Sequence, residues 1–177
     1  MEMKNAQSCV QQNNETFVAI DFETADRQHD SACAVALVRV ESGKITYKRS
    51  FLIRPPRRYF VFTYIHKITW SMVSDQPTFA QLWPDLEPAL KGASFLAAHN
   101  ARFDKSVLNA CCKSAGLKPP EIPFECTVSL ARKTWGIKPT TLPDVCQHLG
   151  IDLDHHDALS DAMACAQIVI EARSAKA

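Results

Sequence analysis

The stretch Phe17-Val-Ala-Ile-Asp-Phe-Glu-Thr24 decides the fold of this chain. It begins as an apolar run typical of a buried strand, and it then carries two carboxylates. Side chains alternate between the two faces of a strand, so Asp21 and Glu23 point to the same face. Two neighbouring anions in an apolar strand repel each other and lose hydration, unless a positive group lies between them. The stretch therefore predicts a divalent metal ion beside the strand, held by further ligands elsewhere in the chain.

The length and composition are those of one globular domain. The chain has 177 residues, 46% of them hydrophobic and 22% charged, which is enough to bury a real core. It has no apolar run of the roughly eighteen residues that a membrane span needs. Residues 1–16 are polar and lack the apolar core of a signal peptide. We expect a flexible tail over residues 1–16, a single domain over residues 17–173, a cytoplasmic location and no membrane partner.

The cysteines and the basic residues are less decisive. The cysteine count is seven, an odd number, and no pair has the C-x-x-C spacing. This usage indicates reduced, partly buried thiols, with a redox or metal role as the alternative. Net charge is only +1, but residues 42–74 contain no acid and seven basic side chains. That segment is either a solvated strand edge or a surface that attracts phosphates.

Three strands open the domain. They are expected at residues 17–24, 33–40 and 44–53. The two-residue turn Ser42-Gly43 joins the second and third strands, which makes them an antiparallel hairpin. Pro55-Pro56 ends the hairpin and opens an irregular, aromatic and basic segment, residues 57–70.

Helices and short strands alternate in the rest of the chain. We expect strands at residues 94–98 and 124–127, a helix that ends at Trp135, and helices at residues 78–90, 101–115, 142–149 and 157–173. Pro84 predicts a kink or an early break in the first of these helices. Asn100 and Asp157 are expected as N-caps of the helices that follow them. This order predicts an α/β fold, with a mixed sheet flanked by helices.

Two further acids occupy unusual places. Asp104 and Asp161 each lie in the first turn of a predicted helix, where the helix dipole alone would favour a carboxylate by about 0.3–1 kcal/mol. The helix that carries Asp161 is apolar almost all round, which indicates burial. No basic residue lies three or four positions from Asp161 to neutralise it. A dipole effect is thus a fair alternative for Asp104 but a weak one for Asp161.

Four carboxylates roughly balance two divalent cations. Ligation by oxygen alone favours hard ions such as Mg²⁺ or Mn²⁺ over zinc. Two such ions close together activate a water and stabilise the leaving oxygen in phosphodiester cleavage. The reaction also needs a base near neutral pH, and His156 lies five residues before Asp161. The alternative for His155 and His156 is an exposed loop without a role.

Three segments resemble known motifs. Asp21-Phe-Glu-Thr24, Asn100-Ala-Arg-Phe-Asp104 and His156-Asp-Ala-Leu-Ser-Asp161 are similar to the three exonuclease motifs of the DEDDh 3′–5′ exonucleases. That family is also called DnaQ-like, after the proofreading subunit of bacterial DNA polymerase III. The resemblance covers residues 17–172, and three motifs in the right order form a specific signal. It implies a ribonuclease H-like fold, with a five-stranded mixed sheet whose first three strands are antiparallel.

The resemblance also implies roles for particular residues. The metal ligands for two Mg²⁺ or Mn²⁺ ions would be Asp21, Glu23, Asp104 and Asp161. His156 would be the general base. The substrate contacts would be Thr24 near the 3′ end, Asn100 and Phe103 on the pocket floor, and Ile65 and His66 beside the terminal base or sugar.

Three positions depart from the family pattern. Ala25-Asp26 follow Thr24, where many relatives have Thr-Gly or Ser-Gly. Lys67 stands where relatives commonly have glycine, and it could contact a phosphate or narrow the pocket. Arg102 is bulkier and more basic than the small residue expected there. None of these changes removes a predicted ligand or the base.

The resemblance implies a metal-dependent exonuclease that releases 5′-mononucleotides from the 3′ end of single-stranded DNA or RNA. The alternatives are a 3′ exoribonuclease specific for RNA or for short oligonucleotides, a phosphodiesterase acting on a small nucleotide, and a nucleic-acid-binding module without catalysis. The short segment after the last predicted helix leads us to expect a stand-alone nuclease rather than one tethered to a polymerase. The sequence leaves the oligomeric state open.

Overall fold

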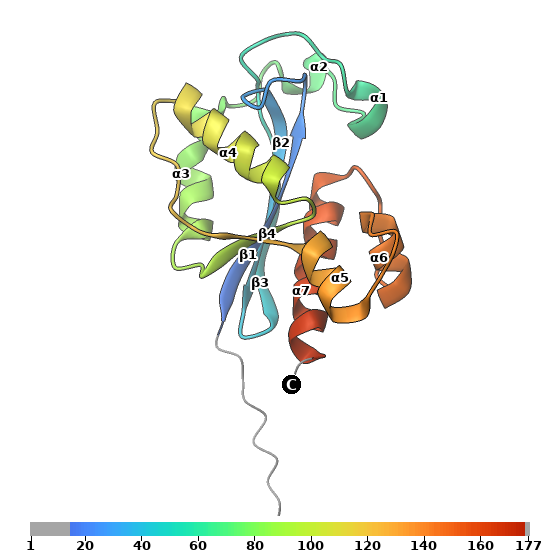
Figure 1. Cartoon of the computed structure of the whole chain (residues 1–177). Coiled ribbons are helices and arrows are strands. Elements are labelled where there is room, and N and C mark those ends of the chain that lie inside the picture. The colour runs from blue at the N-terminus through green and yellow to red at the C-terminus, as the bar shows by residue number, and fades with distance from the viewer. Residues whose placement is uncertain (1–14, 176–177) are drawn as a thin grey trace, which may run out of the picture.

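A five-stranded mixed sheet forms the centre of the molecule (Figure 1). The computed structural model describes residues 15–175. In the order β3-β2-β1-β4-β5, the strands are Lys44–Leu52, Ala32–Glu41, Thr16–Thr24, Phe95–Ala98 and Phe124–Cys126. Strands β1, β2 and β3 are antiparallel, whereas β4 pairs parallel to β1 and β5 pairs parallel to β4. The predicted fold class is confirmed.

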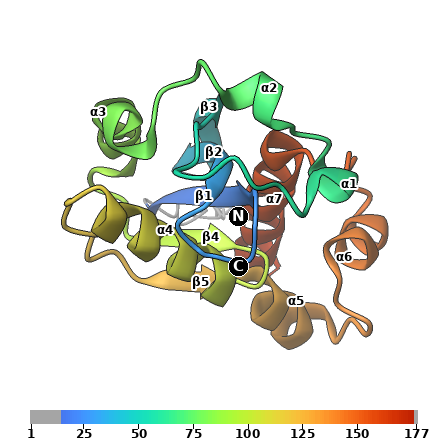
Figure 2. The same ribbon diagram turned by 90° about the horizontal axis from the view of Figure 1, so that it is seen from above.

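Helices cover both faces of the sheet (Figure 2). They are α1 Thr63–His66, α2 Trp70–Val73, α3 Phe79–Leu90, α4 Arg102–Ser114, α5 Thr127–Trp135, α6 Leu142–Leu149 and α7 Ala158–Ser174. Strand β1 feeds two cores because its side chains alternate. Phe17 and Ala19 pack with α5, α6 and α7, while Val18, Ile20 and Phe22 pack with α3 and α4.

The hairpin between β2 and β3 forms as predicted. Glu41 pairs with Lys44, so Ser42 and Gly43 are the two turn residues. Both have positive φ, of 50° and 76° respectively, as the favoured two-residue hairpin turn requires. Strand β3 lies at one edge of the sheet, and most of its side chains are exposed.

Of the two outcomes predicted for Pro84, a kink or an early break, helix α3 excludes the early break. Pro84 and Pro88 both lie inside this helix, and neither ends it before Leu90. A capping box between Thr78 and Gln81 fixes its first turn. Buried side chains on both sides of Pro84 anchor the helix to the sheet, and this packing outweighs the lost backbone hydrogen bond.

The ends of other helices correct further details. Asn100 is not an N-cap, because the cap of α4 is Ala101 and no side chain caps the helix. Asn100 instead has a left-handed backbone, with φ of 66°. Thr127, expected to end a strand, is the first residue of α5. The prediction for Asp157 is confirmed, because its side chain accepts a hydrogen bond from the Ser160 N–H at 2.8 Å.

The start of the domain lies slightly earlier than expected. Most of the predicted tail, residues 1–14, lies outside the described residues. Thr16 already belongs to β1, and the Glu15 carboxylate pairs with Arg173 at 2.9 Å. None of the helices within residues 15–175 is long and apolar enough to span a membrane. The six cysteines in that range are free, and all except Cys126 are buried.

Candidate active site

The four predicted carboxylates converge at the end of β1. Asp21 and Glu23 come from β1, and Asp161 comes from the first turn of α7. Carboxylate oxygens of these three residues all lie within 4.8 Å of one another. Strand β4 pairs with β1 only as far as Ala19, so it leaves the Phe22 N–H without a neighbouring strand on that side. Asp104, in the first turn of α4, accepts this N–H at 3.1 Å.

Burial and mutual repulsion raise the pKa values of this cluster. Burial raises the pKa of Asp21 well above 3.8, and the charges of Asp104, Asp161 and Glu23 add to the effect. Burial, with Asp161 and Asp157 nearby, raises the pKa of Glu23 to about 8. Burial also raises the pKa of Asp104, although the hydrogen bond from the Phe22 N–H acts to lower it. Such groups ionise together near neutral pH only if a cation joins them.

The donor set fits divalent metal ions. Within residues 15–175, no lysine or arginine forms an ion pair with any of the four carboxylates. Their ligand atoms are all carboxylate oxygens, which suit hard cations. The chemistry of the cluster is thus that of a metal centre rather than of a structural salt bridge.

Two histidines lie beside Asp161. The His156 backbone N–H donates to Asp161 Oδ2 at 3.2 Å, and His156 has φ of 72° in the turn before α7. Burial, aided by neighbouring His155, lowers the pKa of His156, which keeps its imidazole neutral at neutral pH. His155 is the closer ring, with its Nδ1 at 3.1 Å from Asp161 Oδ2. The sequence places the pair His155-His156 beside Asp161, but it does not indicate that the His155 ring makes the hydrogen bond.

The His66 side chain has hydrogen-bond partners within the protein. This side chain is buried, and its Nδ1 accepts the Ile68 N–H at 3.0 Å. The proton must therefore lie on Nε2, which donates to the Thr24 carbonyl at 3.1 Å. Both ring nitrogens are used inside the protein, and the contact of His66 with a terminal base or sugar remains a prediction. Its role in the structure is to attach α1 to the end of β1.

The loop after β1 is fastened at two further points. The Ala25 carbonyl accepts the N–H groups of Val61 and Phe62, at 2.6 and 3.4 Å. Arg57 Nε donates to the Asp26 carboxylate at 3.0 Å, and its other nitrogens reach Asp30. Burial alone would raise the pKa of Asp26, but the hydrogen bonds from Arg57 and the Gln28 N–H hold it below its usual range. Asp26, which stands where many relatives have glycine, therefore forms a structural ion pair with Arg57.

The other predicted substrate residues differ in exposure. Thr24 is buried, Ile65 is half-buried and Asn100 is exposed. Phe103 is 37% exposed, and its ring meets His29 edge to face at 6.0 Å. Their contacts with a substrate remain predictions.

The segment around α1 carries two exposed tyrosines that the motifs did not indicate, together with Lys67. Tyr59 and Tyr64 are 68% and 70% exposed. Lys67 ends α1 with φ of 63°, a left-handed conformation that favours glycine. Its charge lies close enough to act on His156, together with burial and His155, in lowering the pKa of that ring. The position of α1 beside His156 depends on tertiary structure and could not be deduced from the motifs.

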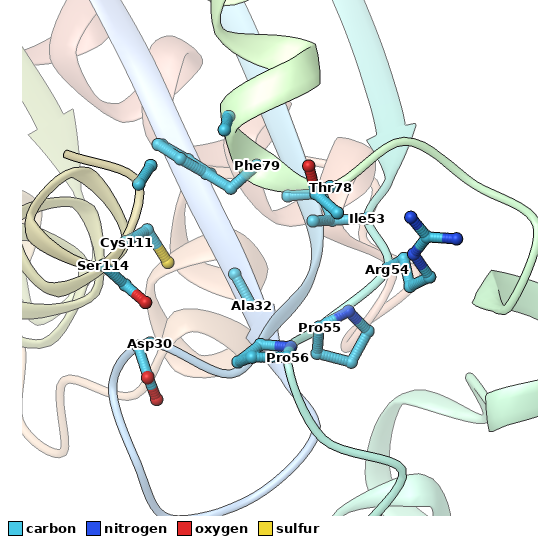
Figure 3. Close-up of a pocket in the computed structure, with 12 residues that line it drawn as sticks. Asp30, Ala32, Ile53, Arg54, Pro55, Pro56, Thr78, Phe79, Cys111 and Ser114 are labelled. Carbon is cyan, nitrogen blue, oxygen red and sulfur yellow. The ribbon is translucent and has the colours of Figure 1, made fainter. Parts of the chain in front are cut away.

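A separate pocket lies away from these carboxylates (Figure 3). Its volume is about 220 Å³, and its lining combines apolar groups such as Ile53 and Phe79 with the charged Asp30 and Arg54. Its lining includes none of the four carboxylates and neither His155 nor His156. The candidate active site is therefore the open carboxylate cluster and not this pocket.

The chain is similar in sequence to known exonucleases. The model of the Exonuclease family matches residues 18–169. DNA polymerase III subunit epsilon of Aquifex aeolicus is 33% identical over 163 residues, covering 88% of this chain and 79% of that protein. Exodeoxyribonuclease 10 of Escherichia coli K12 is 35% identical over 161 residues, covering 86% of this chain and 66% of that protein.

A solved structure shows the same architecture. Exonuclease X in complex with 5′ overhanging duplex DNA superimposes with a TM-score of 0.73 at 28% identity, covering 89% of this chain and 91% of that one. The curated relatives differ greatly in length, and the chain spans between 11% and 79% of those it matches. The matching region contains all four carboxylates and both histidines of the turn.

Proposed function

Since the chain belongs to the Exonuclease family, within the DEDDh or DnaQ-like 3′–5′ exonucleases, we propose that it removes 5′-mononucleotides from the 3′ end of single-stranded nucleic acid. Enzymes of this family depend on divalent metal ions. The observation that carries the proposal is the convergence of ligand atoms of Asp21, Glu23 and Asp161 within 4.8 Å, together with the hydrogen bond that Asp104 of α4 accepts from the Phe22 N–H of β1.

The four carboxylates would hold two Mg²⁺ or Mn²⁺ ions. When bound, such ions supply a nucleophilic water at neutral pH and stabilise the oxygen that leaves. The raised pKa values of Asp21 and Glu23 support this proposal, because carboxylates that repel one another are the groups that gain most from a shared cation.

His156 would accept the proton of the attacking water. Its lowered pKa keeps the ring unprotonated, which a general base requires, and its exposure leaves it open to the reacting groups. The hydrogen bond from its backbone N–H to Asp161 fixes the turn relative to the carboxylates. Removing the base slows such reactions by roughly 10²–10⁴-fold.

The segment from Arg57 to α2 would hold the incoming strand. It has no acid, and it presents exposed Tyr59 and Tyr64 together with Arg58 and Lys67. Bases stack on exposed aromatic rings without regard to sequence, and basic groups attract the phosphates. Residues of this kind beside the base support a nucleic-acid strand over a mononucleotide as the substrate.

The names of the relatives support DNA as the substrate of this chain. The two curated relatives above are named for DNA polymerase III and for an exodeoxyribonuclease, and the solved structure contains duplex DNA with a 5′ overhang. Each name applies to that protein. For this chain we propose single-stranded DNA ends as the preferred substrate.

A panel of oligonucleotides labelled at the 5′ end tests the proposal. With Mg²⁺ present, single-stranded DNA should shorten stepwise from its 3′ end and release nucleoside 5′-monophosphates. RNA, recessed 3′ ends in duplex DNA, and dinucleotides complete the panel. Faster cleavage of RNA or dinucleotides would reject the DNA preference. Absence of all metal-dependent shortening would reject the exonuclease itself.

A further inference from the structure

Two imidazoles and one carboxylate converge at the turn before α7. The ligand atoms of His155, His156 and Asp161 all lie within 4.8 Å of one another. The two rings stack with centroids 3.8 Å apart and planes 22° apart. His155 Nδ1 lies 3.1 and 3.3 Å from the two Asp161 oxygens. Both histidines are exposed, so an ion from solvent has direct access to them.

We propose that His155, His156 and Asp161 form a second kind of metal site, which binds a transition ion such as Zn²⁺ and thereby switches the exonuclease off. The inhibitory half of this inference rests on the proposed function, whereas the binding half does not. The ligand chemistry distinguishes this site from the carboxylate cluster. Two imidazoles with one carboxylate suit Zn²⁺, while four carboxylates suit Mg²⁺ or Mn²⁺.

The local geometry allows three ligands to close around one ion. Zinc takes nitrogen and oxygen ligands at about 2.0–2.2 Å in a tetrahedral arrangement, so the three atoms must approach to about 3.3 Å of one another. The Asp161 oxygen pair and His155 Nδ1 are already that close. The His156 backbone is fixed by the hydrogen bond from its N–H to Asp161 Oδ2. To reach the ion, only the exposed His156 ring therefore has to rotate. A water would complete the fourth position.

Asp161 belongs to both clusters, and this shared residue makes the two sites compete. An ion held by His155, His156 and Asp161 removes the proposed base and one proposed ligand of the carboxylate cluster. Zn²⁺ should therefore inhibit cleavage, and a higher Mg²⁺ concentration should weaken that inhibition. His155 is the one member of the set that is neither a proposed ligand of the carboxylate cluster nor the proposed base, so its removal separates the two sites.

Direct metal binding tests the site without any use of activity. Co²⁺ reports tetrahedral coordination by its visible absorption, and Zn²⁺ then displaces it. The wild-type protein should bind one Co²⁺ with such a spectrum, and His155→Gln should weaken both ions by at least about tenfold. His148→Gln is the matched control, because His148 is another exposed histidine, on α6. It should behave as the wild type does.

Cleavage assays give the second readout. Zn²⁺ added to the Mg²⁺-loaded enzyme should inhibit the wild type and His148→Gln, whereas His155→Gln should need about ten times more Zn²⁺. Because His155 contacts Asp161 and helps lower the pKa of His156, the Zn²⁺ inhibition of each protein is expressed relative to its own cleavage rate with Mg²⁺ alone. His155→Asn serves as a second variant if the first does not fold.

Three results would overturn the inference. The first is a wild-type protein that gives no tetrahedral Co²⁺ spectrum. The second is a His155→Gln variant that binds Co²⁺ and Zn²⁺ as tightly as the wild type does. The third is equal inhibition of the wild type and His155→Gln by Zn²⁺. The last result would place the inhibitory ion among the carboxylates instead. A protein that cleaves nothing with Mg²⁺ would refute the proposed function, and the Co²⁺ titration would still decide whether the metal site exists.

Discussion

Replacing Asp21 by asparagine should stop cleavage and, in the absence of divalent ions, make the protein more stable. Burial and four neighbouring carboxylates raise the pKa of Asp21 well above 3.8. A carboxyl group with a raised folded-state pKa contributes nothing at pH values below 3.8. Its contribution becomes unfavourable as the pH rises from 3.8 towards the folded-state pKa, because the unfolded chain ionises first.

The size of this effect follows from the same numbers. At pH 7.5 the cost of keeping the proton on Asp21 is at most about 5 kcal/mol, at 1.36 kcal/mol per pH unit above 3.8. Sharing of protons among coupled carboxylates and partial solvation reduce this limit, to about 1–2 kcal/mol for one substitution. For a chain of this length that gain raises Tm by about 2–8 °C.

Thermal unfolding in EDTA at pH 7.5 and at pH 4 measures the effect. Asp21→Asn should melt higher than the wild type at pH 7.5, and the difference should shrink at pH 4. Asp85→Asn, at an exposed position on α3, is the matched control and should change Tm little. Excess Mn²⁺ should stabilise the wild type more than Asp21→Asn. A variant that melts lower than the wild type in EDTA at pH 7.5 would refute the reasoning, because Asp21 would then have a stabilising partner within the protein.

Three further substitutions test the segment beside the site. Arg57→Ala leaves the buried Asp26 without its partner and should destabilise the protein by about 1–3 kcal/mol in urea unfolding; an unchanged midpoint would show that the pair contributes nothing. His66→Ala removes the bond to the Thr24 carbonyl and should cost about 1–3 kcal/mol while lowering kcat, so normal kinetics would contradict its positioning role. Lys67→Gly should relieve about 1 kcal/mol of left-handed backbone strain and yet raise KM for single strands, most clearly at low salt. An unchanged KM at every salt concentration would exclude a phosphate contact by Lys67.

The fold could be predicted to the extent that its signals are local. The alternation in β1, the Ser42-Gly43 turn and the cap at Asp157 each act within a few residues, and each is found where expected. The carboxylates Asp21 and Asp161 could be identified for a related reason. Each is a charge in an apolar element, and such a charge requires a compensating partner.

The errors all concern tertiary contacts. Asn100 resembles a helix cap, but it adopts a left-handed backbone that takes the chain from β4 into α4. Pro84 does not break α3, because side chains on both sides of it are buried against the sheet. The hydrogen bonds of His66 with the Ile68 N–H and the Thr24 carbonyl also depend on tertiary structure. Sequence spacing contains no information about these partners.

The number of Mn²⁺ ions bound by the chain tests the central claim most directly. Electron paramagnetic resonance should be recorded as Mn²⁺ is titrated into the wild-type protein and into Asp104→Asn, each with a nucleoside 5′-monophosphate present. The convergence of Asp21, Glu23, Asp104 and Asp161 predicts two ions per wild-type chain and fewer in the variant. Stepwise 3′ cleavage by a wild-type protein that binds no ion, or by an Asp104→Asn variant at the full wild-type rate, would contradict a catalytic centre built from these four carboxylates.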